Sequence, residues 1–135
     1  MLRNSYQRKE GEMEVKDVLG EPVDLSDVEE TQHFKDRLSR IKTYMDKLKD
    51  IGEPSYSFIV DTGHPNGDEV HTITEKGIIV IQNNRTRNVV TVLAARPGQV
   101  RRYWKLMDLD FPTDDKFSTI IRYAQYYQSE GLNNA

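Results

Sequence analysis

The side chains that could do chemistry lie in the second half of the 135-residue chain. His71 is followed along the sequence by Thr91 and Arg96. An imidazole can transfer a proton near neutral pH, whereas a hydroxyl and a guanidinium can donate to charge that develops on a phosphate. Metal-free cleavage of RNA, by attack of a 2′-hydroxyl on the adjacent phosphate, needs only such groups. We therefore take His71, Thr91 and Arg96 as candidate catalytic residues.

The region around these residues is basic, although the whole chain has a net charge of -3. Residues 76–107 contain no Asp or Glu and seven positive side chains: Lys76, Arg85, Arg87, Arg96, Arg101, Arg102 and Lys105. Such a segment favours contact with RNA or another polyanion. The alternative is a solvated sheet edge that Lys and Arg protect from strand pairing. The candidate substrate-binding residues are Arg101, Arg102, Tyr103, Gln99 and Lys76.

Several classes of site are missing from the sequence. The chain has no cysteine, which excludes disulfides, thiolate zinc sites and cysteine nucleophiles. It also lacks a phosphate-binding glycine motif, a nucleophile elbow and an HExxH zinc motif. Residues 61–71 do gather carboxylates and imidazoles, but their spacing matches neither a calcium loop nor a zinc site, so turn chemistry is favoured. We expect no metal and no cofactor.

No apolar run approaches the length of a membrane span, and the N-terminus lacks a signal peptide core. We therefore expect a soluble, cytoplasmic protein with no membrane partner. Its size favours one domain, at residues 25–131, between a flexible or strap-like tail at 1–24 and a frayed end at 132–135.

A helix is predicted from Ser26 to about Ile51. Ser26 and Glu29 fit a capping box, and Gly52 and Pro54 end the segment. Its apolar residues recur every three or four positions: Phe34, Leu38, Ile41, Met45 and Leu48. That stripe would cover one face of a sheet or, alternatively, form the seam of a homodimer.

The next segments predict an antiparallel meander of four strands at residues 56–61, 70–75, 77–82 and 88–95. The apolar run at 78–81 predicts a strand buried on both faces. Helices are predicted at 98–108 and from about 114 to 131, the second capped by Thr113 and Asp114. The predicted fold is α+β, with an N-terminal helix packed on a small four-stranded sheet and two C-terminal helices.

The runs HTITEKGIIVIQ and NRTRNVVTVLAARPGQVRRYW, within residues 70–104, resemble phage-encoded nucleases of the barnase, EndoU, colicin and RelE-like superfamily. The resemblance implies metal-independent ribonuclease activity in the host cytoplasm. It makes His71 the general acid or base and Thr91 a donor to the phosphate. Arg96, Arg102 and Tyr103 would stabilise or position that phosphate. The resemblance also implies a second catalytic histidine, for which His64 and His33 are the candidates; neither lies in a matching motif, and His64 is the better of the two.

Two other functions fit the same sequence. A non-catalytic module would bind nucleic acid through Arg96, Arg101 and Arg102, with stacking by Tyr103 or Trp104. A phage interaction protein would instead use the stripe at 34–48 or the acidic tail to bind a protein partner or inhibitor. His71 as a half-buried strand residue and Thr91 as an ordinary β-former remain the purely structural alternatives.

Overall fold

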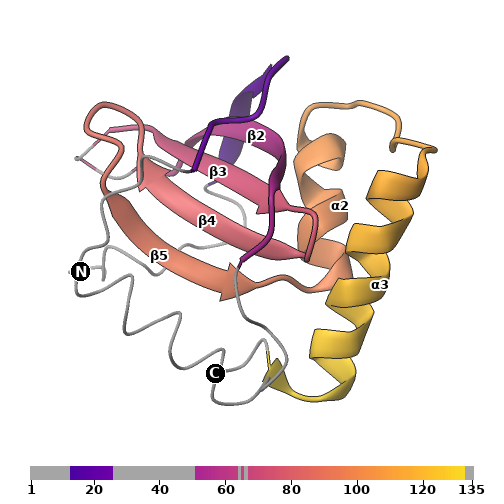
Figure 1. Cartoon of the computed structure of the whole chain (residues 1–135). Helices are drawn as coiled ribbons and strands as arrows, with labels where there is room; N and C mark the ends of the chain where they lie inside the picture. The colour runs from indigo at the N-terminus through magenta and orange to yellow at the C-terminus, as the bar shows by residue number, and fades with distance from the viewer. Residues whose placement is uncertain (1–12, 26–50, 64, 66, 133–135) are drawn as a thin grey trace.

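The computed structural model describes residues 13–25, 51–63, 65 and 67–132. These residues form one five-stranded antiparallel sheet in which neighbours along the chain are neighbours in the sheet. The strands are β1 (Glu14–Leu19), β2 (Pro54–Asp61), β3 (Glu69–Thr74), β4 (Ile78–Asn83) and β5 (Val89–Ala94). Two helices follow, α2 (Pro97–Leu106) and α3 (Asp115–Ser129). Figure 1 shows both helices beside the sheet.

The α+β class holds, but the predicted arrangement is wrong. The sheet has five strands instead of four, and both described helices come after it. The additional strand, β1, lies within the segment predicted as a tail or strap, and it pairs with β2 through Val15 and Val60. The helix predicted from Ser26 lies outside the described residues, apart from Ile51 at its end, which is not helical.

β4 lies between β3 and β5 in the sheet, and its apolar run is buried on both faces, as predicted. Successive strand residues point to opposite faces. Ile79 and Ile81 accordingly join the cluster beneath the helices, whereas Ile78 and Val80 join a second cluster on the other face. A one-residue slip would exchange the two sets, so this pattern helps to fix the register.

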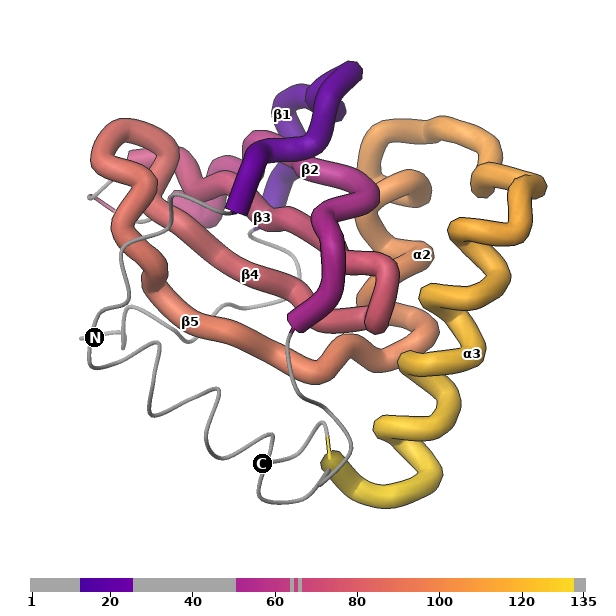
Figure 2. Tube along the Cα trace, in the orientation of Figure 1, coloured from indigo at the N-terminus to yellow at the C-terminus, as the bar shows by residue number. Residues whose placement is uncertain are grey.

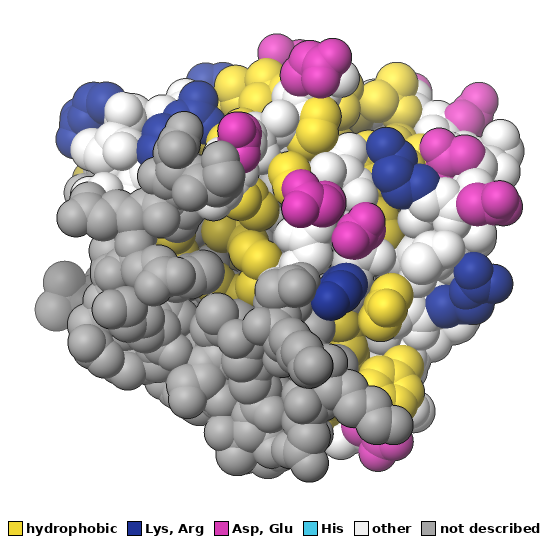
Figure 3. Space-filling view, viewed as in Figure 1, with side chains coloured by type: hydrophobic (Ala, Val, Ile, Leu, Met, Phe, Trp, Pro, Cys, Tyr) yellow, Lys and Arg dark blue, Asp and Glu magenta, His cyan; other side chains and the backbone are white. Residues whose placement is uncertain are grey.

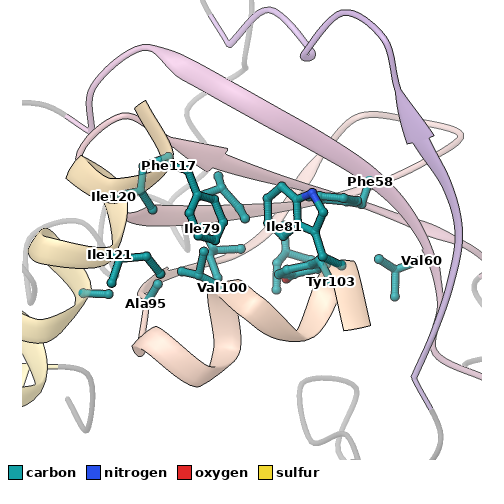
Figure 4. Close-up of a cluster of buried hydrophobic side chains, with 13 residues drawn as sticks. Phe58, Val60, Ile79, Ile81, Ala95, Val100, Tyr103, Phe117, Ile120 and Ile121 are labelled. Atoms are coloured by element: carbon teal, nitrogen blue, oxygen red, sulfur yellow. The ribbon is translucent and has the colours of Figure 1, made fainter. Parts of the chain in front are cut away.

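α2 packs across the sheet through aromatic contacts. Pro97 occupies its first turn, where the missing N–H is not needed. Tyr103 stacks on Phe58 of β2, with ring centres 4.7 Å apart, and Trp104 meets Phe58 edge-on at 5.1 Å. Figure 4 shows Tyr103 beside Phe58 and Ile81 in this buried cluster. Tyr103 is thereby held over the middle of the sheet.

α3 closes the end of the sheet at the turn between β3 and β4. Asp114 caps the helix by accepting the Phe117 N–H at 3.0 Å, as the sequence predicts. Gly77 in the turn has a φ of 73°, and a Cβ there would lie 3.1 Å from the Tyr123 Cβ. Glycine therefore allows close contact between turn and helix. The β4–β5 turn lies at the opposite end, as the tube in Figure 2 shows.

Candidate functional site

Three polar side chains form a hydrogen-bonded line inside the domain. His71 Nε2 lies 3.0 Å from Glu69 Oε1, and His71 Nδ1 lies 2.7 Å from the Tyr103 hydroxyl oxygen. Glu69 and His71 come from β3 and Tyr103 comes from α2. This Glu69–His71–Tyr103 line therefore joins the sheet to the helix.

The strand period explains why two of these residues share a face. Glu69 and His71 are two positions apart on β3, so their side chains point to the same side. The aromatic contacts of α2 then hold the Tyr103 ring against the other side of the imidazole, with the ring centres 5.7 Å apart. The geometry is set by the sheet and the packed helix, with no loop involved.

The line has a preferred direction of hydrogen bonding. An ionised carboxylate can only accept, so an ionised Glu69 takes the hydrogen on His71 Nε2. The lone pair of Nδ1 then accepts the hydrogen of the Tyr103 hydroxyl. A neutral imidazole in this tautomer polarises the tyrosine O–H bond, which is the arrangement of an oriented proton acceptor.

All three side chains are buried: His71 is 2% exposed, Tyr103 3% and Glu69 6%. Burial of a carboxylate and an imidazole costs free energy unless both are hydrogen-bonded, and here they are. Strongly polar groups in such positions are functional candidates because an apolar core would be easier to build.

Thr91 lies on the same face of the sheet. His71 pairs with Ile81 on β4, and Ile81 pairs with Thr91 on β5, which places the three side chains in one row. His71 and Thr91 are thus two strand spacings apart, roughly 10 Å. Thr91 is buried, and its hydroxyl oxygen has no hydrogen-bond partner among the described residues. It is a hydroxyl that a ligand could use.

The other predicted residues are not in this row. Arg96 is exposed at the start of α2, where its backbone N–H donates to the Gln99 side chain at 3.2 Å. Lys76 lies in the β3–β4 turn, and its carbonyl accepts the hydroxyl of Tyr127. The N–H of Ala95 donates to the Gly77 carbonyl, so Arg96 and Lys76 lie toward the α3 end of the sheet.

Two predicted arginines lie beside Tyr103 on α2. Arg101 and Arg102 are both partly exposed, although the Arg102 Nε atom is buried. His64 lies outside the described residues. The structure thus brings His71, Thr91 and Tyr103 to one face, leaves Arg102 next to them along the helix, and separates Lys76, Arg96 and Gln99 from them.

Glu69 is the site residue that the sequence did not single out as a partner of His71. Glu69 lies one residue before the strand predicted at 70–75, whereas β3 begins at Glu69, so its spacing of two from His71 is the signal that could have found it. Among the described residues, no three His, Asp or Glu side chains lie close enough to hold a metal ion.

Charge at the margins of this face is partly paired. Lys16 of β1 lies 3.0 Å from Asp68, and this hydrogen bond raises the pKa of the lysine. Tyr56 lies 3.5 Å from Asp114, and burial, with the charge of that aspartate, raises the pKa of Tyr56 to about 12. Lys16 therefore offsets the negative charge of Asp68, whereas the neutral Tyr56 only hydrogen-bonds Asp114.

In the described part of the chain, no helix is long and apolar enough to cross a membrane. No family model, curated protein or solved structure matches the chain. The resemblance of residues 70–104 to phage nucleases therefore has no support beyond the residues that carry it.

Proposed function

We propose that the protein is a metal-independent ribonuclease whose reactive groups are those of the Glu69–His71–Tyr103 line. The observation that carries this function is the contact of 2.7 Å between His71 and Tyr103, because it joins two predicted site residues from different elements into one proton path. Thr91 in the same row adds a hydroxyl without a partner among the described residues.

Both imidazole nitrogens already have partners, so His71 acts through the tyrosine. The Tyr103 oxygen accepts the proton of the attacking 2′-hydroxyl while its own proton passes to His71 Nδ1. The 2′-oxygen forms a bond to phosphorus, the bond to the 5′-oxygen breaks, and that oxygen leaves with a proton from water. Glu69 stabilises the imidazolium that forms, and Thr91 and Arg102 donate to the phosphate. The products are a 2′,3′-cyclic phosphate and a 5′-hydroxyl.

This chemistry sets a structural requirement. Tyr103 is almost fully buried, and a phosphate must lie within hydrogen-bond reach of its oxygen. Cleavage therefore requires that the protein atoms covering the Tyr103 hydroxyl move aside when RNA binds. Such conformational opening is common at catalytic sites.

The direct test is incubation of labelled single-stranded RNA with the purified protein in EDTA, beside His71→Gln and Thr91→Val variants. We expect cleavage by the native protein, loss of activity in His71→Gln, and a smaller loss in Thr91→Val. Circular dichroism of each variant separates lost chemistry from lost folding. Intact RNA with folded native protein would reject the ribonuclease function.

The burial of His71 and Tyr103 favours a second function, in which the protein binds RNA or another polyanion without cleaving it. The cations needed are exposed: Arg96 at the start of α2, and Lys105 in its last turn. In that case His71→Gln leaves affinity unchanged, whereas raised salt weakens it. In either function we place the protein in the cytoplasm of a host cell, as a phage or prophage product.

A further inference from the structure

The turn between β4 and β5 combines a rigid backbone with exposed positive charge. Arg85 and Arg87 are both exposed, and neither guanidinium has an ion-pair partner in the described part of the chain. In Figure 3, Lys and Arg side chains, in dark blue, gather over the region where Figure 1 places this turn.

Side chains at the base of the turn hold its backbone in place. Asn83 Oδ1 accepts the N–H groups of Arg85 at 2.9 Å and Thr86 at 3.0 Å. The Asn83 carbonyl accepts the Arg87 N–H at 2.8 Å, and Gln82 Nε2 donates to the Arg87 carbonyl at 3.0 Å. Binding of a ligand to this turn would therefore cost little backbone conformational entropy.

Arg87 occupies a conformation that arginine does not favour. Its φ is 65°, in the left-handed region where a hairpin turn usually has glycine or asparagine. The Arg87 side chain makes no hydrogen bond or ion pair with the described residues that would offset this strain. Strained residues of this kind recur at ligand-binding positions, where the side chain is required for reasons other than stability.

The turn is adjacent to the site described above. Asn83, at its base, pairs with Glu69, and the Asn84 N–H donates to the Asp68 carbonyl at 3.0 Å. The Asp68 carboxylate lies beside Lys16, which reduces its repulsion of an anion. Ile81 in the His71 row is two residues from Asn83, roughly 7 Å along the strand. A few nucleotides would span this distance.

We propose that the β4–β5 turn is a phosphate-binding anchor for single-stranded RNA, in which Arg85 and Arg87 hold the backbone of nucleotides flanking the one at Tyr103. This anchor rests on the proposed ribonuclease function, and it defines the substrate as an RNA strand longer than the cleaved dinucleotide. Guanidinium groups on a rigid turn suit phosphate because they donate in a fixed planar geometry.

The substitution Arg87→Gly tests the anchor because it separates charge from structure. Glycine adopts a φ of 65° without strain, so the variant should melt at the native temperature or slightly above it. Its affinity for RNA should nevertheless fall. Arg122→Ala, which removes an exposed cation from α3, is the matched control and should bind like the native protein.

The probe is a fluorescent 2′-O-methyl RNA oligonucleotide, which binds but cannot be cleaved because its 2′-oxygen is blocked. We expect Arg85→Ala combined with Arg87→Gly to weaken binding roughly tenfold and to reduce the slope of log affinity against log salt by about 0.7 for each arginine removed. Unchanged affinity and slope, or no binding by the native protein, would overturn the anchor. Failure of the native protein to cleave unmodified RNA would overturn only the ribonuclease function, because this probe reports binding alone.

Discussion

The two faces of the sheet both contain buried polar side chains, but of different kinds. On the face covered by α2, a carboxylate and an imidazole are hydrogen-bonded to a phenol from the helix. On the opposite face, Ser57 and Thr72 pair through their hydroxyls at 2.7 Å, and Ser57 also accepts the Val23 N–H at 2.8 Å. The hydroxyl pair joins neighbouring strands of the sheet, whereas the titratable groups join the sheet to α2.

This difference bears on function. A buried hydroxyl pair can be replaced by apolar groups at little cost, so its presence calls for no role beyond packing. A buried carboxylate and imidazole are harder to accommodate. Truncation of one leaves the other buried without its hydrogen-bond partner, which costs free energy. The α2 face is therefore where we place the chemistry.

The largest effect is expected from His71→Ala. The substitution leaves a cavity and removes a hydrogen-bond partner from both Glu69 and Tyr103, so the free energy of unfolding should fall by about 3–5 kcal/mol. Urea denaturation monitored by tryptophan fluorescence measures it. A loss below about 1 kcal/mol would mean that the line contributes no more than the hydroxyl pair, and the contrast between the faces would be lost.

Tyr103→Phe should cost less, because the ring and its stacking on Phe58 are kept. The His71 Nδ1 atom loses its hydroxyl partner, and we expect a decrease of about 1–3 kcal/mol in the same denaturation experiment. If the variant is as stable as the native protein, the 2.7 Å contact does not order the imidazole.

Thr72→Val on the opposite face should have a smaller effect still. Ser57 keeps the Val23 N–H as a partner, and valine preserves the shape of the threonine, so we expect a loss of about 0.5–1.5 kcal/mol. A decrease as large as that for His71→Ala would show that the two faces do not differ in the way described.

The smallest effect concerns Tyr56 at the rim of the α2 face. Its folded pKa of about 12 lies above the value of about 10 expected in the unfolded chain. Its contribution to stability is therefore complete below pH 10 and is lost as the pH rises from about 10 to 12. Because the ring is only partly buried and solvent screens its hydroxyl, the loss should be slight. Tyr56→Phe should flatten this part of the stability curve, and an identical pH dependence would contradict the assignment.

Much of the sheet could be predicted because its strands carry simple patterns. The apolar run of β4 indicated burial on both faces, and Asp114 marked the start of α3. β1 could not be predicted in the same way. An edge strand buries little, and Glu14, Lys16 and Asp17 are all exposed. Its position is fixed by pairing with β2, which is a tertiary effect.

The candidate site was only partly predictable for a related reason. His71 was identified from its chemistry, and Glu69 could have been found from its spacing of two on the same strand. The contact with Tyr103 depends on how α2 crosses the sheet, which the aromatic packing on Phe58 decides. The periodicity of apolar residues along one element does not predict how α2 crosses the sheet.

The most direct measurement of the central claim uses a DNA strand that contains one ribonucleotide, incubated with the native protein in EDTA. The account predicts a single cut after that ribonucleotide, leaving a 2′,3′-cyclic phosphate, and loss of this cut in Tyr103→Phe while the variant remains folded. Cleavage at deoxynucleotides, or an undiminished cut in Tyr103→Phe, would contradict a mechanism in which the 2′-hydroxyl gives its proton to the Glu69–His71–Tyr103 line.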